Sequence, residues 1–404
     1  MSGGLWLSGL AALALLHTYW FYPTYLRVRE RHLPPDQSPP YPAVYPTVSV
    51  LVAAYNEEAI IVEKLRTVLA STYPSERLHL YVGSDRSTDR TNALLHELAA
   101  DEPRLQVFPF TERRGKPGVI NELAARALAR HPAAPDHIFL LTDANVLLEP
   151  DTLRNLVRHF AAEPALALVD SHLVHTRPGS GGVGGSERAY IGREVRIKYR
   201  EGRLWRRMIG PFGGCYALRS NYFRPVPPDS LVDDFYLAMQ VFVRGGGARN
   251  DLTAYSYEAV GERLDEEFRR KARISTGNVQ NLRTFRRLWW PPTTPLGFAF
   301  FSHKILRWLG PLWLLLLYGG AAWAAGGGNM PGVYLFTGIN VLLVGLPLLD
   351  WGLHHLGLPA GPLRTWRYFV LMNVALGLGW WRYLTAEQRG IWEPPRREEG
   401  GGSR

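Results

Sequence analysis

The chain has 404 residues, a formal net charge of +10 and a single cysteine, Cys215. One cysteine excludes an internal disulfide framework and a zinc site built from cysteines. A charged fraction of 20% with 12% aromatic residues excludes a disordered chain, and the length suffices for two or three domains. The positive charge alone permits a nucleic acid, a membrane surface or a phosphorylated ligand as partner.

The first apolar segment covers residues 5–26 and contains no Asp, Glu, Lys or Arg. At about 1.5 Å rise per residue, such a run crosses a hydrocarbon core of about 30 Å. We therefore predict a transmembrane helix within residues 1–28. Arg27, Arg29 and Arg31 follow it, and the positive-inside rule then places the next domain in the cytoplasm. A cleaved signal peptide is the alternative, but the segment has an uncharged start and a bulky aromatic end.

A Pro-rich linker over residues 29–46 leads into a body over residues 47–290, in which strand-like and helix-like segments alternate. The predicted strands are 47–54, 78–84, 104–110 and 137–144, and the predicted helices are 58–71, 87–99, 115–130 and 151–162. Continuous apolar strands are typical of a buried parallel sheet. The alternation predicts an α/β, Rossmann-like fold with a mostly parallel sheet and right-handed crossovers.

Further apolar segments follow the body, at residues 305–325 and 333–349 and, more weakly, at 367–384. They predict interfacial and C-terminal transmembrane helices over residues 291–385, before a basic tail at 386–404. Four spans would place the arginines of the tail outside, against the positive-inside rule. This leaves open whether one of the segments is interfacial or re-entrant.

Polar side chains follow three of the predicted strands at the edge where ligands of such sheets bind. They are Tyr55 and Glu57, then Asp85, then Asp143 with Asn145 two residues later. A carboxylate followed by a second oxygen donor suits Mg²⁺ or Mn²⁺ and a diphosphate. Each group alone also has a structural explanation, such as a turn or a helix cap. Neither a Gly-rich dinucleotide fingerprint nor a P-loop is present in the sequence.

Seven segments occur in order: VSVLVAAYNEE, YVGSDRSTDRT, RRGKPGVINELA, LLTDANVLLEPDTL, GGCYALR, LVDDFYLAMQV and RRKARISTGN. Together they resemble the membrane-embedded family 2 glycosyltransferases, which include cellulose, chitin and hyaluronan synthases and many bacterial relatives. The resemblance covers about residues 45–310. It implies a cytoplasmic GT-A domain flanked by transmembrane helices, in a multi-pass protein of the bacterial cytoplasmic (inner) membrane. It also implies inverting transfer from a nucleotide-diphosphate sugar, usually UDP-linked, with a divalent metal as cofactor.

The same resemblance assigns the donor-side residues one by one. Tyr55 would stack on the base, Glu57 would hydrogen-bond it and Asp85 would contact the nucleoside. Lys116 would contact the diphosphate, and Asp143 matches the metal-binding carboxylate of the DxD motif. A solvated lysine at a helix start is the alternative for Lys116.

On the acceptor side, Asp234 matches the general base and Asp233 is its acidic neighbour, although Asp233 as the working carboxylate remains an alternative. Arg273 matches the arginine of the QxxRW motif, which steadies the diphosphate or the acceptor site, and lipid phosphate is its alternative ligand. Gly214 and Cys215 lie in the segment that borders the acceptor. A buried structural cysteine is the other interpretation of Cys215.

The sequence departs from the family pattern at two motifs, and these departures bear on the metal site and on the type of product. The DxD motif ends in Asn145, so the second metal ligand is neutral. Arg270 and Ile274 replace the Gln and Trp of QxxRW, and an aromatic face suits the end of a sugar chain. The sequence thus favours transfer to a membrane-associated lipid or glycan acceptor over processive polysaccharide synthesis. A non-catalytic nucleotide-sugar-binding membrane scaffold is the alternative of another class, and a nucleic-acid partner is not expected.

Overall fold

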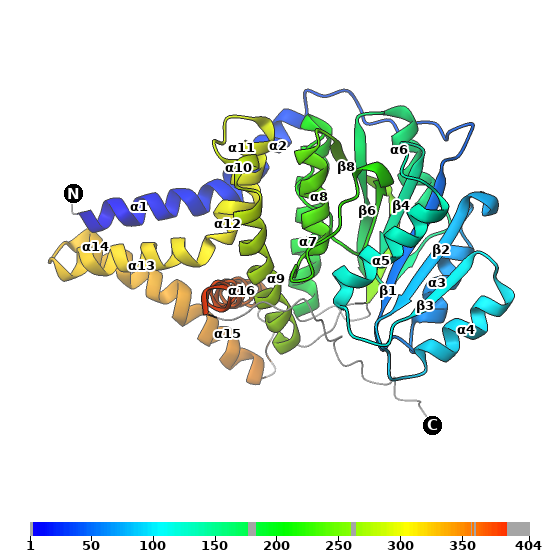
Figure 1. Cartoon of the computed structure of the whole chain (residues 1–404). Helices are drawn as coiled ribbons and strands as arrows, with labels where there is room; N and C mark the ends of the chain where they lie inside the picture. The colour runs from blue at the N-terminus through cyan, green and yellow to red at the C-terminus, as the bar shows by residue number, and fades with distance from the viewer. Residues whose placement is uncertain (1–2, 177–182, 260–263, 357, 359–360, 386–404) are drawn as a thin grey trace. The chain divides into compact units, whose positions relative to one another are not determined.

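The computed structural model describes residues 3–176, 183–259, 264–356, 358 and 361–385 (Figure 1). The predicted basic tail, 386–404, lies outside the described residues. The chain divides into two units. The helical unit comprises Met1–His32, Pro178–Glu194 and Glu262–Glu387, and the sheet unit comprises Leu33–Arg177 and Val195–Gly261.

The sheet unit is built on an eight-stranded sheet of order β3-β2-β1-β4-β7-β6-β8-β5. The predicted strands form its parallel half: β1 (Thr47–Ala54), β2 (Leu78–Ser84), β3 (Leu105–Pro109) and β4 (His137–Thr142). The other strands are β5 (Val146–Leu148), β6 (Leu166–Thr176), β7 (Cys215–Arg219) and β8 (Gly247–Ala259). β7 runs antiparallel to both β4 and β6, and β5 runs antiparallel to β8. The sheet is therefore mixed, and the expectation of a mostly parallel sheet is wrong for this half.

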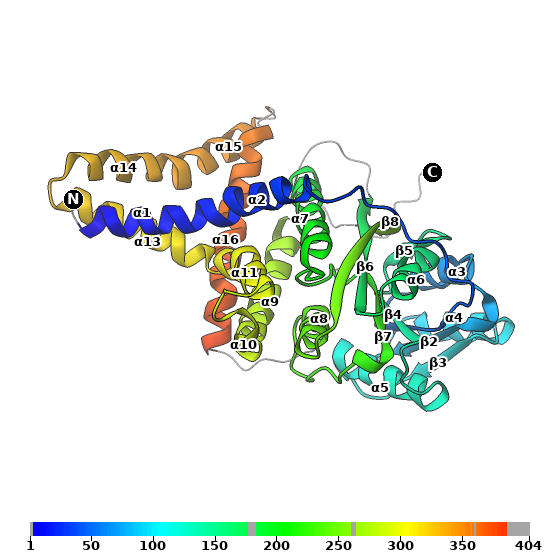
Figure 2. The same cartoon turned by 90° about the horizontal axis from the view of Figure 1, so that it is seen from above.

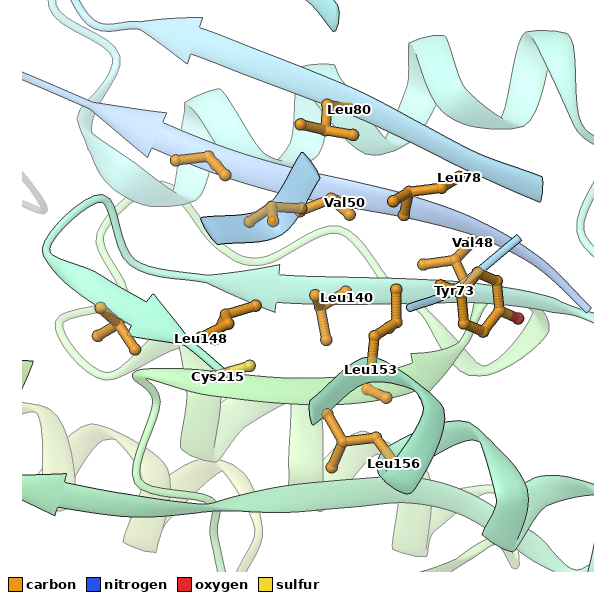
Figure 3. Packing of buried hydrophobic residues seen from close by; sticks show 14 of the residues in the cluster. Val48, Val50, Tyr73, Leu78, Leu80, Leu140, Leu148, Leu153, Leu156 and Cys215 are labelled. Atoms are coloured by element: carbon orange, nitrogen blue, oxygen red, sulfur yellow. The ribbon is translucent and has the colours of Figure 1, made fainter. Parts of the chain in front are cut away.

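Helices cover both faces of the sheet (Figure 2). The four predicted helices are present as α3 (Ile61–Leu69), α4 (Thr91–Asp101), α5 (Gly115–Arg130) and α6 (Thr152–Ala162). On α6, Leu153, Leu156, Val157 and Phe160 are buried at helical spacing, which gives one apolar face. That face packs with α3 and α4 on the sheet residues shown in Figure 3. α5 and α8 (Asp233–Val243) cover the opposite face.

Residues 29 and 30 of the predicted Pro-rich linker end α2 (Tyr22–Glu30), whereas residues 33–46 contain no helix or strand and are bound along the sheet unit. The Asp36 carboxylate accepts a hydrogen bond from the Tyr199 hydroxyl at 2.7 Å and pairs with Arg249 at 3.2 Å. Further along, the Tyr41 hydroxyl donates to Asn155 Oδ1 at 2.9 Å. The linker therefore has fixed contacts with α6, α7 (Val183–Trp205) and β8.

The helical unit contains two helices long and apolar enough to cross a membrane, Gly3–Glu30 and Met330–His355, among the described residues. Pro295–Trp308 and Gly310–Gly326 would make a third span, bent by 62°. The predicted spans 5–26, 305–325 and 333–349 lie in these helices. The weaker prediction at 367–384 falls in α16 (Gly361–Thr385), which is long enough but too polar to meet the same standard.

Small residues bring the first helix close to α13 (Gly310–Gly326). A Cβ atom on Gly4 would lie 2.4 Å from the carbonyl oxygen of Gly320, so both positions need glycine. The Ser8 hydroxyl donates to the Leu317 carbonyl at 3.0 Å in the same contact. Close approach through glycine and a serine hydrogen bond is how helices associate without a hydrophobic driving force.

Three histidines meet at the amino ends of β2 and β4. The ring of His131 lies 4.5 Å from that of His79 and 5.7 Å from that of His137, between centroids. Burial, followed by the charge of neighbouring groups, lowers the pKa of His79 and of His137 to about 4. A histidine whose pKa is lowered by folding stabilises the fold at pH values above its unfolded pKa of about 6.5. This stability is lost as the pH falls towards the folded pKa of about 4.

We expect this cluster to make the thermal midpoint of the sheet unit sensitive to acid. His137 is only 3% exposed, and its shift corresponds to about 3 kcal/mol, or roughly 6–12 °C in Tm for a unit of this size. His137→Gln should therefore lose much less Tm than the native chain between pH 7 and pH 4.5. His96→Gln is the control, because His96 is exposed on α4. If both variants change the loss of Tm between pH 7 and pH 4.5 equally, the interpretation is contradicted.

Candidate active site

Asp85 joins the end of β2 to the start of α5. Its buried carboxylate accepts hydrogen bonds from the backbone N–H groups of Arg114 at 2.6 Å and Gly115 at 3.0 Å. These N–H groups at a helix start have no partner within the helix, and the helix dipole favours an anion there. Asp85 thus fixes the start of α5, the helix that carries Lys116, rather than capping the helix that follows it in sequence.

Arg113 contacts both Tyr55 and Asp85 and so links the two side chains. The Arg113 guanidinium carbon is 3.4 Å from the centre of the Tyr55 ring, and its Nε is 3.2 Å from Asp85 Oδ2. A base stacking on Tyr55 would have to share or displace this cation. Glu57 is 3% exposed, and its backbone N–H donates to the Thr91 hydroxyl at 2.9 Å. The sequence motifs did not identify Arg113, although it belongs to the RRGKPGVIN segment.

Lys116 is the centre of the charged cluster. Its Nζ lies 2.7 Å from Asp143 Oδ1 and 3.5 Å from Asp233 Oδ2. Burial disfavours the charged ammonium, but the carboxylates of Asp143, Asp233 and Asp234 outweigh burial and raise the pKa of Lys116. Lys116 therefore stays charged within an acidic surrounding. The structure thus brings together residues from α5, the end of β4 and α8.

Asp143 and Asn145 follow β4, with about a third of the Asp143 side chain (34%) exposed. Burial raises the pKa of Asp143, and Lys116 opposes that effect. The Asn145 amide nitrogen donates to Glu258 Oε1 at 3.2 Å, so the amide oxygen is the atom left to act as a metal ligand. These two hard oxygen donors fit Mg²⁺ or Mn²⁺, which keep further positions for water and phosphate. No group of three or more His, Cys, Asp or Glu able to hold a metal occurs in the described part of the chain.

Asp233 and Asp234 form the first turn of α8, where a helix favours negative charge. Burial and then the charge of Asp233 raise the pKa of Asp234. Gly213 lies against this carboxylate with φ of +86°, and a Cβ atom there would be 2.6 Å from Asp234 Oδ2. The position of Asp234 therefore depends on a glycine at residue 213.

Gly213→Ala is expected to lower kcat by about 10²-fold, because the added methyl group would displace the Asp234 carboxylate. The alanine would also be strained at this positive φ, at a cost of about 1–3 kcal/mol. Gly245→Ala is the matched control, since Gly245 has φ of +77° and nothing within 4 Å of an added Cβ. Equal losses of kcat in the two variants would show that backbone strain alone is responsible.

Hydrogen bonds that involve Gly214 and Lys64 fix the end of β4 and the loop that carries Asp143. The Gly214 carbonyl accepts from the Asp143 N–H at 3.0 Å and from the Thr142 hydroxyl at 2.9 Å. The fully buried Lys64 Nζ donates to Thr142 Oγ1 at 2.8 Å, and burial lowers the pKa of Lys64 to about 8. The sequence did contain a signal for Lys64, because it lies on the apolar face of α3.

Cys215 is 1% exposed and packs in the hydrophobic core (Figure 3). Burial raises the pKa of its thiol to about 11. Its side chain therefore does not reach an acceptor, which favours the structural interpretation of this residue. Gly214, its neighbour, contributes through its backbone.

Arg273 is half-buried in α9 (Leu264–Thr284), which belongs to the helical unit. It is therefore not among the residues that the sheet unit brings together. In the same helix Arg270, at the place of the family's Gln, pairs with Glu267 at 2.7 Å. Lys271 pairs with the same carboxylate at 3.1 Å, so Glu267 gathers two neighbouring cations.

Comparison with known proteins shows which protein family this chain resembles. The model of the family described as Glycosyl transferase family 2 matches residues 49–223. The beta-monoglucosyldiacylglycerol synthase of Synechocystis is 33% identical over 140 residues, which cover 32% of this chain and 27% of the relative. The poly-beta-1,6-N-acetyl-D-glucosamine synthase of Staphylococcus aureus is 27% identical over 122 residues, covering 30% and 27%. The chain thus spans about a quarter of the length of each relative.

One solved structure resembles nearly the whole chain. It is the mannosyltransferase PcManGT from Pyrobaculum calidifontis in complex with GDP-Man and Mn²⁺, with a TM-score of 0.67. The sequence identity is 24%, and the match covers 94% of this chain and 99% of the other. At this identity the likeness concerns the fold, which is GT-A-like.

Proposed function

Because residues 49–223 form a family 2 glycosyltransferase domain, we propose that this chain is an inverting glycosyltransferase. It moves a sugar from a nucleotide-diphosphate sugar, with UDP as the first candidate nucleotide, to a membrane-associated lipid or glycan acceptor. The observation that carries the proposal is the contact of Lys116 with both Asp143 and Asp233. This contact joins a candidate diphosphate site to the pair of acidic residues that contains Asp234, the candidate base.

In this reaction the acceptor hydroxyl oxygen bonds to the anomeric carbon as the bond from that carbon to the diphosphate breaks. Asp234 accepts the hydroxyl proton, and its raised pKa suits a group that must take a proton near neutral pH. Lys116 offsets the charge on the departing diphosphate. A divalent metal held by Asp143 and Asn145 would supply further positive charge there.

The nucleoside side of the donor is assigned to Tyr55, Glu57 and Asp85. Asp85 binds the start of α5 and is linked to Tyr55 by Arg113, and Glu57 contacts Thr91 at the start of α4. Arg273, in α9, is the residue to which we assign the steadying of the diphosphate or the acceptor. α9 packs on α16 and belongs to the unit that contains the helices apolar enough to cross a membrane, which also fits a role at a lipid-linked acceptor.

The proposal also covers the kind of acceptor and the location of the protein in the cell. The two candidate membrane helices and the name of a diacylglycerol-glucosylating relative support a lipid acceptor. Ile274, in place of the family's Trp, supports transfer of single sugars over processive synthesis. We place the protein in the bacterial inner membrane as a multi-pass protein, with residues 47–290 as the cytoplasmic domain between membrane parts at 1–28 and 291–385.

Membranes containing the chain should be incubated with radiolabelled UDP-glucose, UDP-N-acetylglucosamine and GDP-mannose in turn, with Mn²⁺ or with chelator. Label is expected in the organic extract, as a product with one sugar, and chelator should abolish it. A long, water-soluble product would support the processive alternative. Binding of the nucleotide sugars without transfer of any of them would support the non-catalytic scaffold and contradict the proposal.

A further inference from the structure

The turn that carries Asp143 and Asn145 is fixed beside the end of β8. The Val146 N–H donates to the Asp143 carbonyl at 3.2 Å, so residues 143–146 form a single tight turn. Val146 then pairs in register with Glu258 on β8. Both candidate metal ligands therefore lie on one short turn, and Glu258 occupies the strand position next to it.

Glu258 contacts the second of these ligands directly. The Asn145 Nδ2 atom donates to Glu258 Oε1 at 3.2 Å. A carboxylate has only acceptor atoms, so the nitrogen end of the amide must face it. Because the amide group is planar, its oxygen then points away from Glu258. The contact therefore determines which end of the Asn145 side chain a metal can meet.

His175 faces the other oxygen of the same carboxylate. It is the register partner of Glu258 on β6, and its Nε2 atom lies 3.4 Å from Glu258 Oε2. The two side chains are only 5% and 21% exposed. With Asn145 at one oxygen and His175 at the other, the Glu258 carboxylate has little freedom to turn.

The chemistry of the two side chains explains why an amide suits this turn. The oxygens of a carboxylate are equivalent, so either can bind a metal, whereas an amide offers a ligand only when its oxygen faces the metal. A carboxylate in place of the Asn145 amide would also lie against Glu258, and like charges at that distance disfavour each other. The neutral residue in the DxD motif and the carboxylate on β8 are therefore complementary.

We infer that Glu258 is a positioning residue of the metal site, which holds the Asn145 amide with its oxygen available to Mg²⁺ or Mn²⁺. The Glu258–Asn145 pair thereby replaces the second carboxylate of the DxD motif, and His175 fixes the pair from β6. The inference deepens the proposed function and rests on its metal site at Asp143 and Asn145. Outer-shell groups of this kind typically contribute about 10–100-fold to metal affinity.

The Mn²⁺ affinity of the detergent-solubilised full chain tests the inference without turnover. Mn²⁺ should be titrated by electron paramagnetic resonance, with and without UDP. Glu258→Met removes the acceptor at a similar side-chain length and should weaken Mn²⁺ binding by about 10–100-fold. Glu258→Gln removes the charge but keeps an acceptor oxygen, so it should retain most of the affinity. Equal losses in the two variants would mean that Glu258 acts by charge alone and would overturn the inference.

Glu149→Met is the matched control. Glu149 is also partly buried, and its carboxylate accepts a hydrogen bond from the Tyr257 hydroxyl on the same strand as Glu258. Its loss removes an equal charge but leaves the Asn145 amide in place, so Mn²⁺ affinity should stay close to that of the native chain. A loss as large as in Glu258→Met would contradict the inference. Should Glu258→Met fail to fold, Glu258→Ala makes the same comparison.

A double-mutant cycle separates action through Asn145 from direct action on the metal. In an Asn145→Ala background, Glu258→Met should cost no further Mn²⁺ affinity, because the amide that Glu258 positions is gone. A further loss as large as in the native background would overturn the inference, and so would a native chain that binds no Mn²⁺ with or without UDP. Mn²⁺ binding with this coupling but no sugar transfer would support the inference and contradict the proposed function. Sugar transfer without the coupling would overturn the inference and leave the proposed function in place.

Discussion

Asp234→Asn is expected to lower kcat by about 10²–10⁴-fold, the usual contribution of a general base, with little change in binding of the nucleotide sugar. The amide has nearly the shape of the carboxylate, so it fits against Gly213 but cannot accept the proton of the acceptor. Single-turnover rates and equilibrium binding of the nucleotide sugar would separate the two effects.

Asp233→Asn is the matched control, because it removes one charge from the neighbouring residue. Asp233 contacts Lys116 at 3.5 Å, so its loss should act mainly on donor binding and raise KM. The reverse pattern, with the larger loss of kcat in Asp233→Asn, would assign the base to Asp233. Unchanged transfer by Asp234→Asn would contradict the proposed mechanism.

Lys116→Met is expected to lower kcat by about 10²–10³-fold while it tightens Mn²⁺ binding to the free protein. The ammonium that offsets charge on the leaving diphosphate is lost. The same ammonium lies 2.7 Å from Asp143 Oδ1 and competes there with the metal, so its removal frees that oxygen. Initial rates and Mn²⁺ titration by electron paramagnetic resonance would measure the two effects.

Arg126→Met is the control for Lys116→Met, since Arg126 is an exposed cation on the same helix and pairs with Glu122 at 2.9 Å. It should change neither the rate nor Mn²⁺ affinity. If Lys116→Met behaves in the same way, Lys116 is a solvated lysine at a helix start, and the charged cluster has no part in transfer.

The strand–helix pairs of residues 47–162 were predictable because their information is local. Each strand is a short, continuous apolar run, and each helix has apolar residues at helical spacing. The second half of the sheet was not predictable in the same way. β5 has three residues and β7 has five, and β7 is set by pairing with β4 and β6, which lie far away in the chain.

The candidate site divides in a similar manner. Asp85, Asp143 and Lys116 stand in recognisable segments, and their positions after strands predicted a common edge. Two contacts in the site join residues that are distant in sequence. Asp85 binds the start of α5 across 29 residues, and Lys64 donates to Thr142 across 78 residues. No local pattern encodes which partner a buried polar group finds.

By itself, the sequence determined the α/β class, the apolar helices at both ends and the segments that carry the polar site residues, because propensity and periodicity act over a few residues. Only the tertiary structure decided that the sheet is mixed, that Cys215 faces the core and that Lys116 contacts both Asp143 and Asp233. These outcomes depend on which strands pair and which side chains share a buried space, and that choice is made by the whole packed unit rather than by any one segment.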